Sequence, residues 1–197
     1  MHPTDHHRLQ QQTARDLYDD VRRFFRTKLP APDCYDQAHA VIEAFLKVPP
    51  GRIHGDRRAY LMGMARKYVL KYFERQRPTE RFDSARMSVS GITSMSERFD
   101  RRNVLLNALR SLPLDQQIAV EQHLLERRTY EEVAQTLGVS LATAKRRVAD
   151  GRRALAEQLA DWRAERREDR PAQGSSASAD DLDDATVQRL RAAYAEA

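Results

Sequence analysis

The amino-acid sequence predicts an all-α fold of two small helical domains joined by a flexible linker, the second domain containing a helix-turn-helix. Apolar residues recur at helical spacing almost throughout the 197 residues. No alternating strand pattern is backed by turn signals. A stretch rich in serine and threonine, residues 78–96, separates two such helical regions. We therefore expect domains at 1–77 and 97–165, followed by a low-complexity tail with a short acidic helix at 166–197.

Three helices are expected in the first domain. The first runs from about Leu9 to Leu29 and is stopped by prolines. The second is capped by Asp33 and continues to Val48. A loop with two glycines, residues 51–58, separates it from a third helix at about 56–77.

Residues 129–155 have the spacing of a helix-turn-helix, preceded by helices at about 97–110 and 115–127. Thr129 and Glu132 are placed as a capping box, and Gly138 ends the short helix that they begin. Ser140 caps the next helix after a turn of about three residues. That helix has one apolar side and basic residues on its other faces, as a helix in the DNA major groove requires. The inward residues are Ala144, Val148, Gly151 and Leu155.

The charge distribution is compatible with a polyanionic partner. The formal net charge is +5, but the segment after Arg170 holds five acids against two arginines, so the first 170 residues carry +8. Such a basic body favours nucleic acid, although a solvated basic face explains the charge alone equally well. A single cysteine, Cys34, fits a reducing compartment. No apolar run approaches the roughly 20 residues of a membrane span, so a cytoplasmic protein without membrane contact is expected.

No catalytic chemistry is indicated by the residues. There is no evident set of nucleophile, base and orienting group, and no glycine loop that could cradle phosphates. His2, His6 and His7 are interpreted as part of a disordered terminus rather than a metal site. We therefore expect no enzyme, no cofactor and no metal.

Three stretches resemble the extracytoplasmic-function sigma factors of bacterial RNA polymerase. "LRSLPLDQQIAVEQHLLERRTYEEVAQTLGVSLATAKRRVADGRRAL" resembles their second conserved domain. "DCYDQAHAVIEAFLKV" is similar to their polymerase-binding helix, and "YLMGMARKYVLKYFERQR" to the helix after it. The resemblance covers roughly residues 14–159, with both domains in the right order. It implies a non-catalytic subunit that recruits core RNA polymerase to specific promoters and initiates transcription.

The resemblance also implies three groups of site residues and several partners. Besides promoter DNA, the partners are the β′ coiled coil and the β flap of core polymerase, and an anti-sigma factor. Docking on the β′ coiled coil falls to Asp33, Asp36, His39, Glu43 and Phe45. Capture of the melted minus-ten strand falls to Arg52, His54, Arg57, Arg58, Tyr60, Arg66, Lys67 and Lys71. Reading of the minus-thirty-five element falls to Ser140, Thr143, Lys145, Arg146, Arg147, Arg152 and Arg153.

Departures from the family pattern leave two other functions open. Tyr35 and Ala40 stand where glutamates are usual, which would suit a helix-turn-helix regulator that has lost polymerase docking. A sigma mimic held by an anti-sigma partner is the other alternative. Tyr68 and Tyr72 either stack on melted bases or belong to the core.

The acidic tail lies outside the resemblance. Leu182, Val187, Leu190 and Tyr194 are spaced as a weak apolar stripe. Together with the nearby acids, this stripe would dock on a basic DNA-binding or polymerase-binding surface and damp activity; a solvated appendage is the alternative. Basic surfaces on both domains argue against tight packing of one domain on the other.

Overall fold

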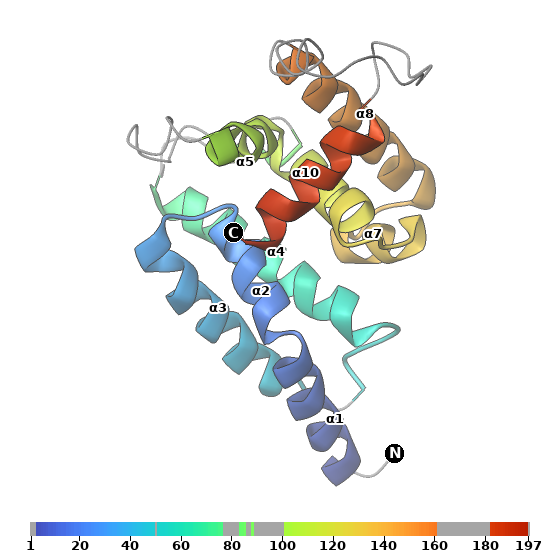
Figure 1. The fold of residues 1–197 in the computed structure, drawn as a ribbon. Coiled ribbons are helices and arrows are strands. Elements are labelled where there is room, and N and C mark those ends of the chain that lie inside the picture. Colours follow the sequence, from blue (N-terminus) through green and yellow to red (C-terminus); the bar gives the residue numbers. More distant parts are fainter. Residues whose placement is uncertain are drawn as a thin grey trace.

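A computed structural model describes residues 3–49, 51–76, 83–85, 88, 101–160 and 182–196 of the chain. The described residues are helical and contain no strand, so the predicted all-α class is confirmed (Figure 1). No helix among them is long and apolar enough to cross a membrane. The elements are α1 (Pro3–Asp16), α2 (Tyr18–Arg26), α3 (Ala31–Leu46), α4 (Arg57–Gln76), α5 (Arg101–Ser111), α6 (Leu114–Val120), η3 (Glu121–Leu125), α7 (Tyr130–Leu137), α8 (Leu141–Gln158) and α10 (Asp184–Ala195).

The N-terminal part, α1–α4, begins earlier than the sequence predicts. Residues expected in a disordered terminus form α1, because this helix is fastened to the end of α3. The Gln10 side-chain amide donates to the carbonyls of Phe45, at 2.9 Å, and Val48, at 3.1 Å. The expected first helix is also divided at Leu17, whose backbone leaves the α conformation between α1 and α2.

The predicted cap of α3 is wrong. Pro30 is the N-cap, and Asp33 lies inside the first turn, where its charge is favourable to the helix dipole. Pro32 is tolerated in this turn because the first amides of a helix have no intrahelical partner. The Asp33 carboxylate instead accepts a 2.7 Å hydrogen bond from the Tyr72 hydroxyl.

The helix-turn-helix of the C-terminal part, α5–α8, forms as predicted. Thr129 Oγ1 accepts from the Glu132 amide at 3.3 Å, while the Glu132 carboxylate accepts from the Thr129 amide at 2.8 Å. Gly138 takes a left-handed conformation, with φ of 67°, and ends α7. Ser140 Oγ then caps α8 by accepting from the Thr143 amide at 3.2 Å.

The helix expected at 115–127 consists of an α-helix followed by a π-helix. It starts as α6 and continues as the π-helix η3, in which the Glu126 amide donates to the Glu121 carbonyl five residues earlier, at 2.9 Å. Glu121 is 1% exposed and Glu126 is half-buried. Both carboxylates are used in contacts with the N-terminal part.

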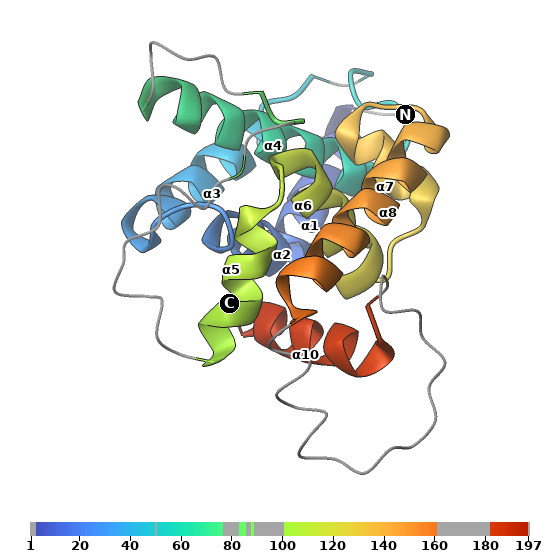
Figure 2. The same ribbon diagram turned by 90° about the horizontal axis from the view of Figure 1, so that it is seen from above.

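The two parts pack tightly against each other, so the expectation that basic surfaces would keep them apart is wrong. A single apolar cluster includes Phe45 and Val69 of the N-terminal part together with Leu114, Ile118 and Val133 of the C-terminal part. Figures 1 and 2 show α4 running beside α7. Charge repulsion is avoided because buried carboxylates of the C-terminal part face cations of the N-terminal part.

Helix α10 covers the outer side of the C-terminal part. In Figure 1 it runs from the α8 side towards α2. The predicted stripe of Leu182, Val187, Leu190 and Tyr194 is buried. It packs on an apolar surface built from α5, η3 and the end of α8, rather than on basic side chains as expected. The alternative of a solvated appendage is therefore also wrong.

Gly151 allows α6 and α8 to approach closely. A Cβ atom at this position would lie 2.6 Å from Val120 Cγ2. We expect Gly151→Ala to lower the free energy of unfolding by about 1–2 kcal/mol, because the overpacking cost outweighs the gain in helix propensity. Urea unfolding measures this change. Val120→Ala provides room, so the double variant should lose less than the two single variants together.

Candidate nucleic-acid interface

The outward face of α8 offers cations to a ligand. Lys145, Arg146 and Arg153 are exposed, whereas the predicted inward residues Ala144 and Val148 are at most 1% exposed. Ser140 and Thr143 stand at the start of the helix, where Ser140 Oγ caps it by accepting from the Thr143 amide. Asp150, on the outward side, lies 3.8 Å from Arg153 and lowers the positive charge there. Arg152 is half-buried.

Arg147 does not share this outward position. Its Nη2 lies 3.0 Å from Oδ2 of Asp115, a residue of α6 that is 1% exposed. Arg66 of α4 binds the same carboxylate, with Nε 2.7 Å from Oδ1 and Nη2 3.1 Å from Oδ2. One buried aspartate thus pairs with an arginine from each predicted DNA-binding surface.

Some of the other residues predicted to hold the minus-ten strand have exposed side chains, whereas others are partly buried. Arg52 and His54, in the loop before α4, are exposed. Lys67 and Lys71 are exposed on one face of α4, since they lie four residues apart. Arg57 is half-buried. The four exposed residues are directly accessible to a nucleic-acid strand.

Arg58 is held by carboxylates from both parts. Its Nη2 lies 3.0 Å from Asp20 Oδ2 and 2.7 Å from Glu126 Oε2. Burial alone would lower the pKa of Arg58, but Glu126 and Asp20 together raise it above its usual value. The guanidinium therefore stays charged, and it is not available to DNA while these pairs persist.

The three tyrosines near this surface pack against the core. Tyr60 contacts Phe45, with ring centroids 6.4 Å apart. Tyr68 donates to the Ala40 carbonyl at 3.4 Å. Burial, helped by the bond to Asp33, raises the pKa of Tyr72 to about 12. Of the two alternatives, the structure favours the core, because Tyr68 and Tyr72 are partly buried and pack against it.

The outward face of α3 carries most of the predicted polymerase-docking residues. Asp36, His39 and Glu43 are exposed, and their spacing places them on one side of the helix. His39 stacks on Tyr18 of α2, and its Nε2 is 2.7 Å from the Tyr18 hydroxyl. Phe45 does not belong to this face, because its side chain is fully buried in the core. The departure residue Tyr35 is 44% exposed.

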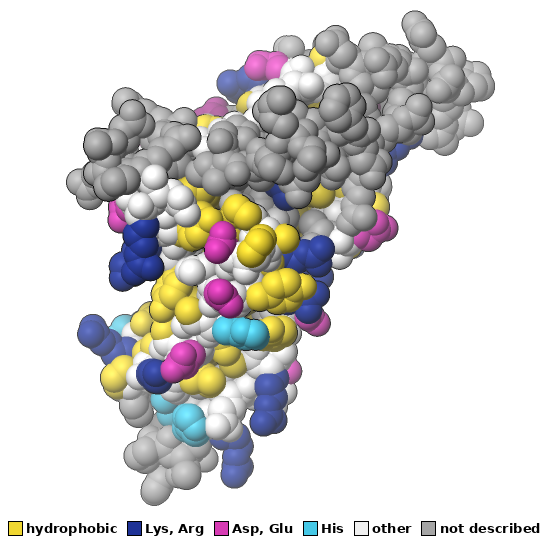
Figure 3. Space-filling view, turned by 90° about the vertical axis from the view of Figure 1, so that its left-hand side faces the viewer, with side chains coloured by type: hydrophobic (Ala, Val, Ile, Leu, Met, Phe, Trp, Pro, Cys, Tyr) yellow, Lys and Arg dark blue, Asp and Glu magenta, His cyan; other side chains and the backbone are white. Residues whose placement is uncertain are grey.

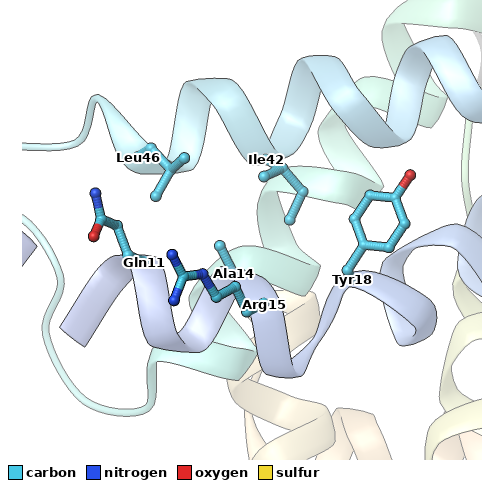
Figure 4. A pocket seen from close by; sticks show the side chains of 6 residues that line it. All are labelled: Gln11, Ala14, Arg15, Tyr18, Ile42 and Leu46. Atoms are coloured by element: carbon cyan, nitrogen blue, oxygen red, sulfur yellow. The ribbon is translucent and has the colours of Figure 1, made fainter. Parts of the chain in front are cut away.

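An apolar groove of about 470 Å³ borders the same face, between α3 and the end of α1. Ile42 and Leu46 form one wall, while Ala14 and Tyr18 form the other, with Gln11 and Arg15 at the rim (Figure 4). Figure 3 views the molecule from the side where α3 lies in Figure 1. Hydrophobic side chains on this side are interspersed with acidic, basic and histidine side chains.

Comparison with known families identifies the segment that contains the helix-turn-helix. Residues 102–155 match the family model of Sigma-70, region 4. The match supports a sigma factor role in promoter recognition and transcription, as a regulator rather than an enzyme, with core RNA polymerase and promoter DNA as the partners that such a domain implies. No curated protein matches the chain.

The region 4 segment, residues 102–155, contributes three carboxylates that pair with cations of the N-terminal part across the interface. Asp115 binds Arg66, Glu121 binds Lys28, and Glu126 binds Arg58. These contacts join residues 49, 93 and 68 positions apart. Sequence analysis missed all three acids, and the only available signal was the placement of charged residues within apolar helical patterns.

Metal chemistry finds no support in the described ranges. No group of three or more histidine, cysteine, aspartate or glutamate side chains there could hold a metal ion. His6 and His7, interpreted above as part of a disordered terminus, lie on α1, where His6 is buried and His7 contacts Gln11 at 2.8 Å. His2 lies outside the described residues.

Proposed function

We propose that the chain is a sigma factor of the extracytoplasmic-function type, which recruits core RNA polymerase to specific promoters and initiates transcription. The observation that carries this proposal is a helix-turn-helix, capped at both helices and exposing Lys145 and Arg146, within a segment that matches sigma-70 region 4. Such a helix can insert its exposed cations into the major groove while its other face stays packed. The proposal implies a cytoplasmic protein.

The two parts have separate tasks in this proposal. The region 4 segment reads the minus-thirty-five element and contacts the β flap. The loop before α4 and the exposed lysines of α4 hold the melted minus-ten strand, since cations there can follow its backbone. Arg58 and Arg66 join this surface only after they leave Glu126 and Asp115.

Polymerase docking is assigned to α3. Its acidic residues Asp36 and Glu43 would face a basic coiled coil of β′, and the groove beside Ile42 and Leu46 supplies apolar contact. Phe45 supports the helix from within the core rather than by direct contact. A hydrogen bond from Lys47 lowers the pKa of Glu43.

The experiment mixes purified protein with bacterial core RNA polymerase and a library of promoter-sized DNA from its own host. Specific run-off transcripts that require the protein are expected. Sequencing them would give the promoter.

Arg146→Ala tests the assignment of the recognition helix. Loss of one arginine that contacts a base should weaken promoter binding about 5- to 150-fold, corresponding to about 1–3 kcal/mol. Fluorescence anisotropy at constant salt measures the affinity. Arg8→Ala removes another exposed arginine, from α1, and should leave the affinity unchanged. Equal effects of the two variants would refute the assignment.

A DNA-binding regulator that has lost polymerase docking is the second candidate. It is favoured by Tyr35, an exposed aromatic residue on α3, and by Ala40, both at positions where the family that this sequence resembles usually has glutamates. Sequence-specific DNA binding without association with core polymerase would establish this function. Association without promoter opening would instead indicate a sigma mimic held by an anti-sigma factor.

A further inference from the structure

Helix α10 is seated by both apolar and polar contacts. Leu190 is fully buried and Tyr194 is 3% exposed, both within the apolar cluster that also contains Leu105, Leu109 and Leu155. Arg191 Nε donates to the Leu124 carbonyl at 2.8 Å. The helix is N-capped by Asp183, whose carboxylate accepts from the Thr186 amide at 2.7 Å. A helix with its own cap and a buried face is a docked element of the fold.

The end of α10 completes a ring of five side chains that spans both parts. Tyr194 donates to Glu126 Oε1 at 2.8 Å, and Glu126 Oε2 accepts from Arg58 at 2.7 Å. Arg58 also binds Asp20, which lies 3.3 Å from Arg23. The Arg23 guanidinium then lies over the Tyr194 ring, 5.6 Å from its centroid. Thus α10 touches the N-terminal part directly and also fixes the carboxylate that holds Arg58.

Tyr194 keeps its proton in this position. Burial, and then the charges of Glu121 and Glu126, raise its pKa well above the usual value. The hydroxyl therefore remains a donor to Glu126 throughout the physiological pH range.

The closed arrangement removes three predicted DNA contacts at once. Arg58 is held by Glu126, while Arg66 and Arg147 share Asp115. Their side chains are 11%, 19% and 18% exposed, respectively. Each carboxylate occupies the position on its arginine that a DNA phosphate would need. DNA binding must therefore compete with closure.

One polar atom at the interface lacks a hydrogen bond, which favours reversible closure. The Gln117 side-chain amide donates to the Thr27 carbonyl of the N-terminal part at 3.4 Å, but Gln117 Oε1 is buried without a hydrogen-bond partner. Such an atom costs free energy while the parts are closed, since water can satisfy it on opening.

We propose that α10 is an inhibitory clamp within the chain: it locks the two parts closed through Tyr194 and Glu126, and its displacement frees the arginines for promoter DNA. The inference that α10 inhibits DNA binding rests on the proposed function, whereas the inference that α10 holds the two parts closed does not. Helix α10 lies outside the segment that matches region 4, residues 102–155.

The test compares Leu190→Glu with Ala192→Glu in the full-length chain. Both add a carboxylate to α10, but Leu190 is fully buried and Ala192 is exposed. Spin labels at Glu74→Cys on α4 and Gln135→Cys on α7, both exposed positions, report the separation of the two parts. Binding to a 40-base-pair mixed-sequence duplex at constant salt reports DNA affinity. Circular dichroism checks that each variant is folded.

Leu190→Glu is expected to lengthen the distance between the labels and to raise DNA affinity at least fivefold over Ala192→Glu. Tyr194→Phe, which keeps the ring and removes only the hydroxyl, should shift both in the same direction by a smaller amount. An unchanged distance overturns the clamp. A longer distance with unchanged affinity overturns its inhibitory role. Absence of DNA binding in every protein overturns the proposed function and the inhibitory role together, while the distance still reports whether α10 closes the chain.

Discussion

Lys28→Met is expected to lower the free energy of unfolding by about 3–5 kcal/mol, because it leaves the Glu121 carboxylate buried without a cationic partner. The two side chains are 0% and 1% exposed, and Nζ lies 2.5 Å from Oε2. The ammonium also donates to Phe24 O at 3.2 Å and Thr27 Oγ1 at 3.0 Å, so its three protons are all used. Urea unfolding measures the loss.

A double variant distinguishes the contribution of the ion pair from the cost of leaving one charge buried and unpaired. Lys28→Met with Glu121→Leu removes both charges and should recover most of the stability, since a buried ion pair is often no better than an apolar pair of similar volume. Burial lowers the pKa of Lys28 despite the attraction of Glu121, which shows that desolvation exceeds the attraction. A double variant as unstable as the single one would contradict this account.

Asp115→Asn is expected to lower the free energy of unfolding by about 2–4 kcal/mol, the second large effect. The carboxylate lies at the centre of three short contacts with Arg66 and Arg147, and it also accepts from Ser84 Oγ at 3.2 Å. An amide keeps the shape but loses the charge and one acceptor oxygen. The arginines regain some water because they are partly exposed, so the loss is smaller than the sum of the bonds.

Asp36→Asn is the matched control for Asp115→Asn. Asp36 is exposed on α3, and the same change there should alter stability by less than about 0.5 kcal/mol. Urea unfolding of both variants in parallel provides the comparison. A loss below about 1 kcal/mol for Asp115→Asn would mean that the two arginines do not depend on this carboxylate.

Local features were predictable from the sequence because their causes are local. The capping box at Thr129, the left-handed Gly138 and the cap at Ser140 each depend on residues within a few positions. The inward stripe of α8 follows from helical periodicity alone. Prolines misled the prediction for α3, since Pro30 served as the cap and Pro32 was accepted inside the first turn.

Long-range pairing was not predictable in the same way. Arg66 and Arg147 are basic residues on helical faces, and the sequence gives no sign that Asp115 binds both. Periodicity identifies an inward position but not the partner across an interface, so Phe45 was assigned to docking although it is buried. The exposed cations Lys67, Lys71, Lys145 and Arg146 keep the positions that the sequence suggests.

The π-helix η3 affects the directions in which Glu121 and Glu126 point. In a regular α-helix, residues five apart are rotated by about 140° around the axis, so Glu121 and Glu126 would point in different directions. The bond from the Glu126 amide to the Glu121 carbonyl brings these two positions almost into line. Both carboxylates can then reach the N-terminal part, one at Lys28 and the other at Arg58. Deleting one residue between them, such as Gln122, would place the two glutamates four positions apart in an α-helix, about 40° apart around the axis, and should keep both carboxylates on the side of the N-terminal part.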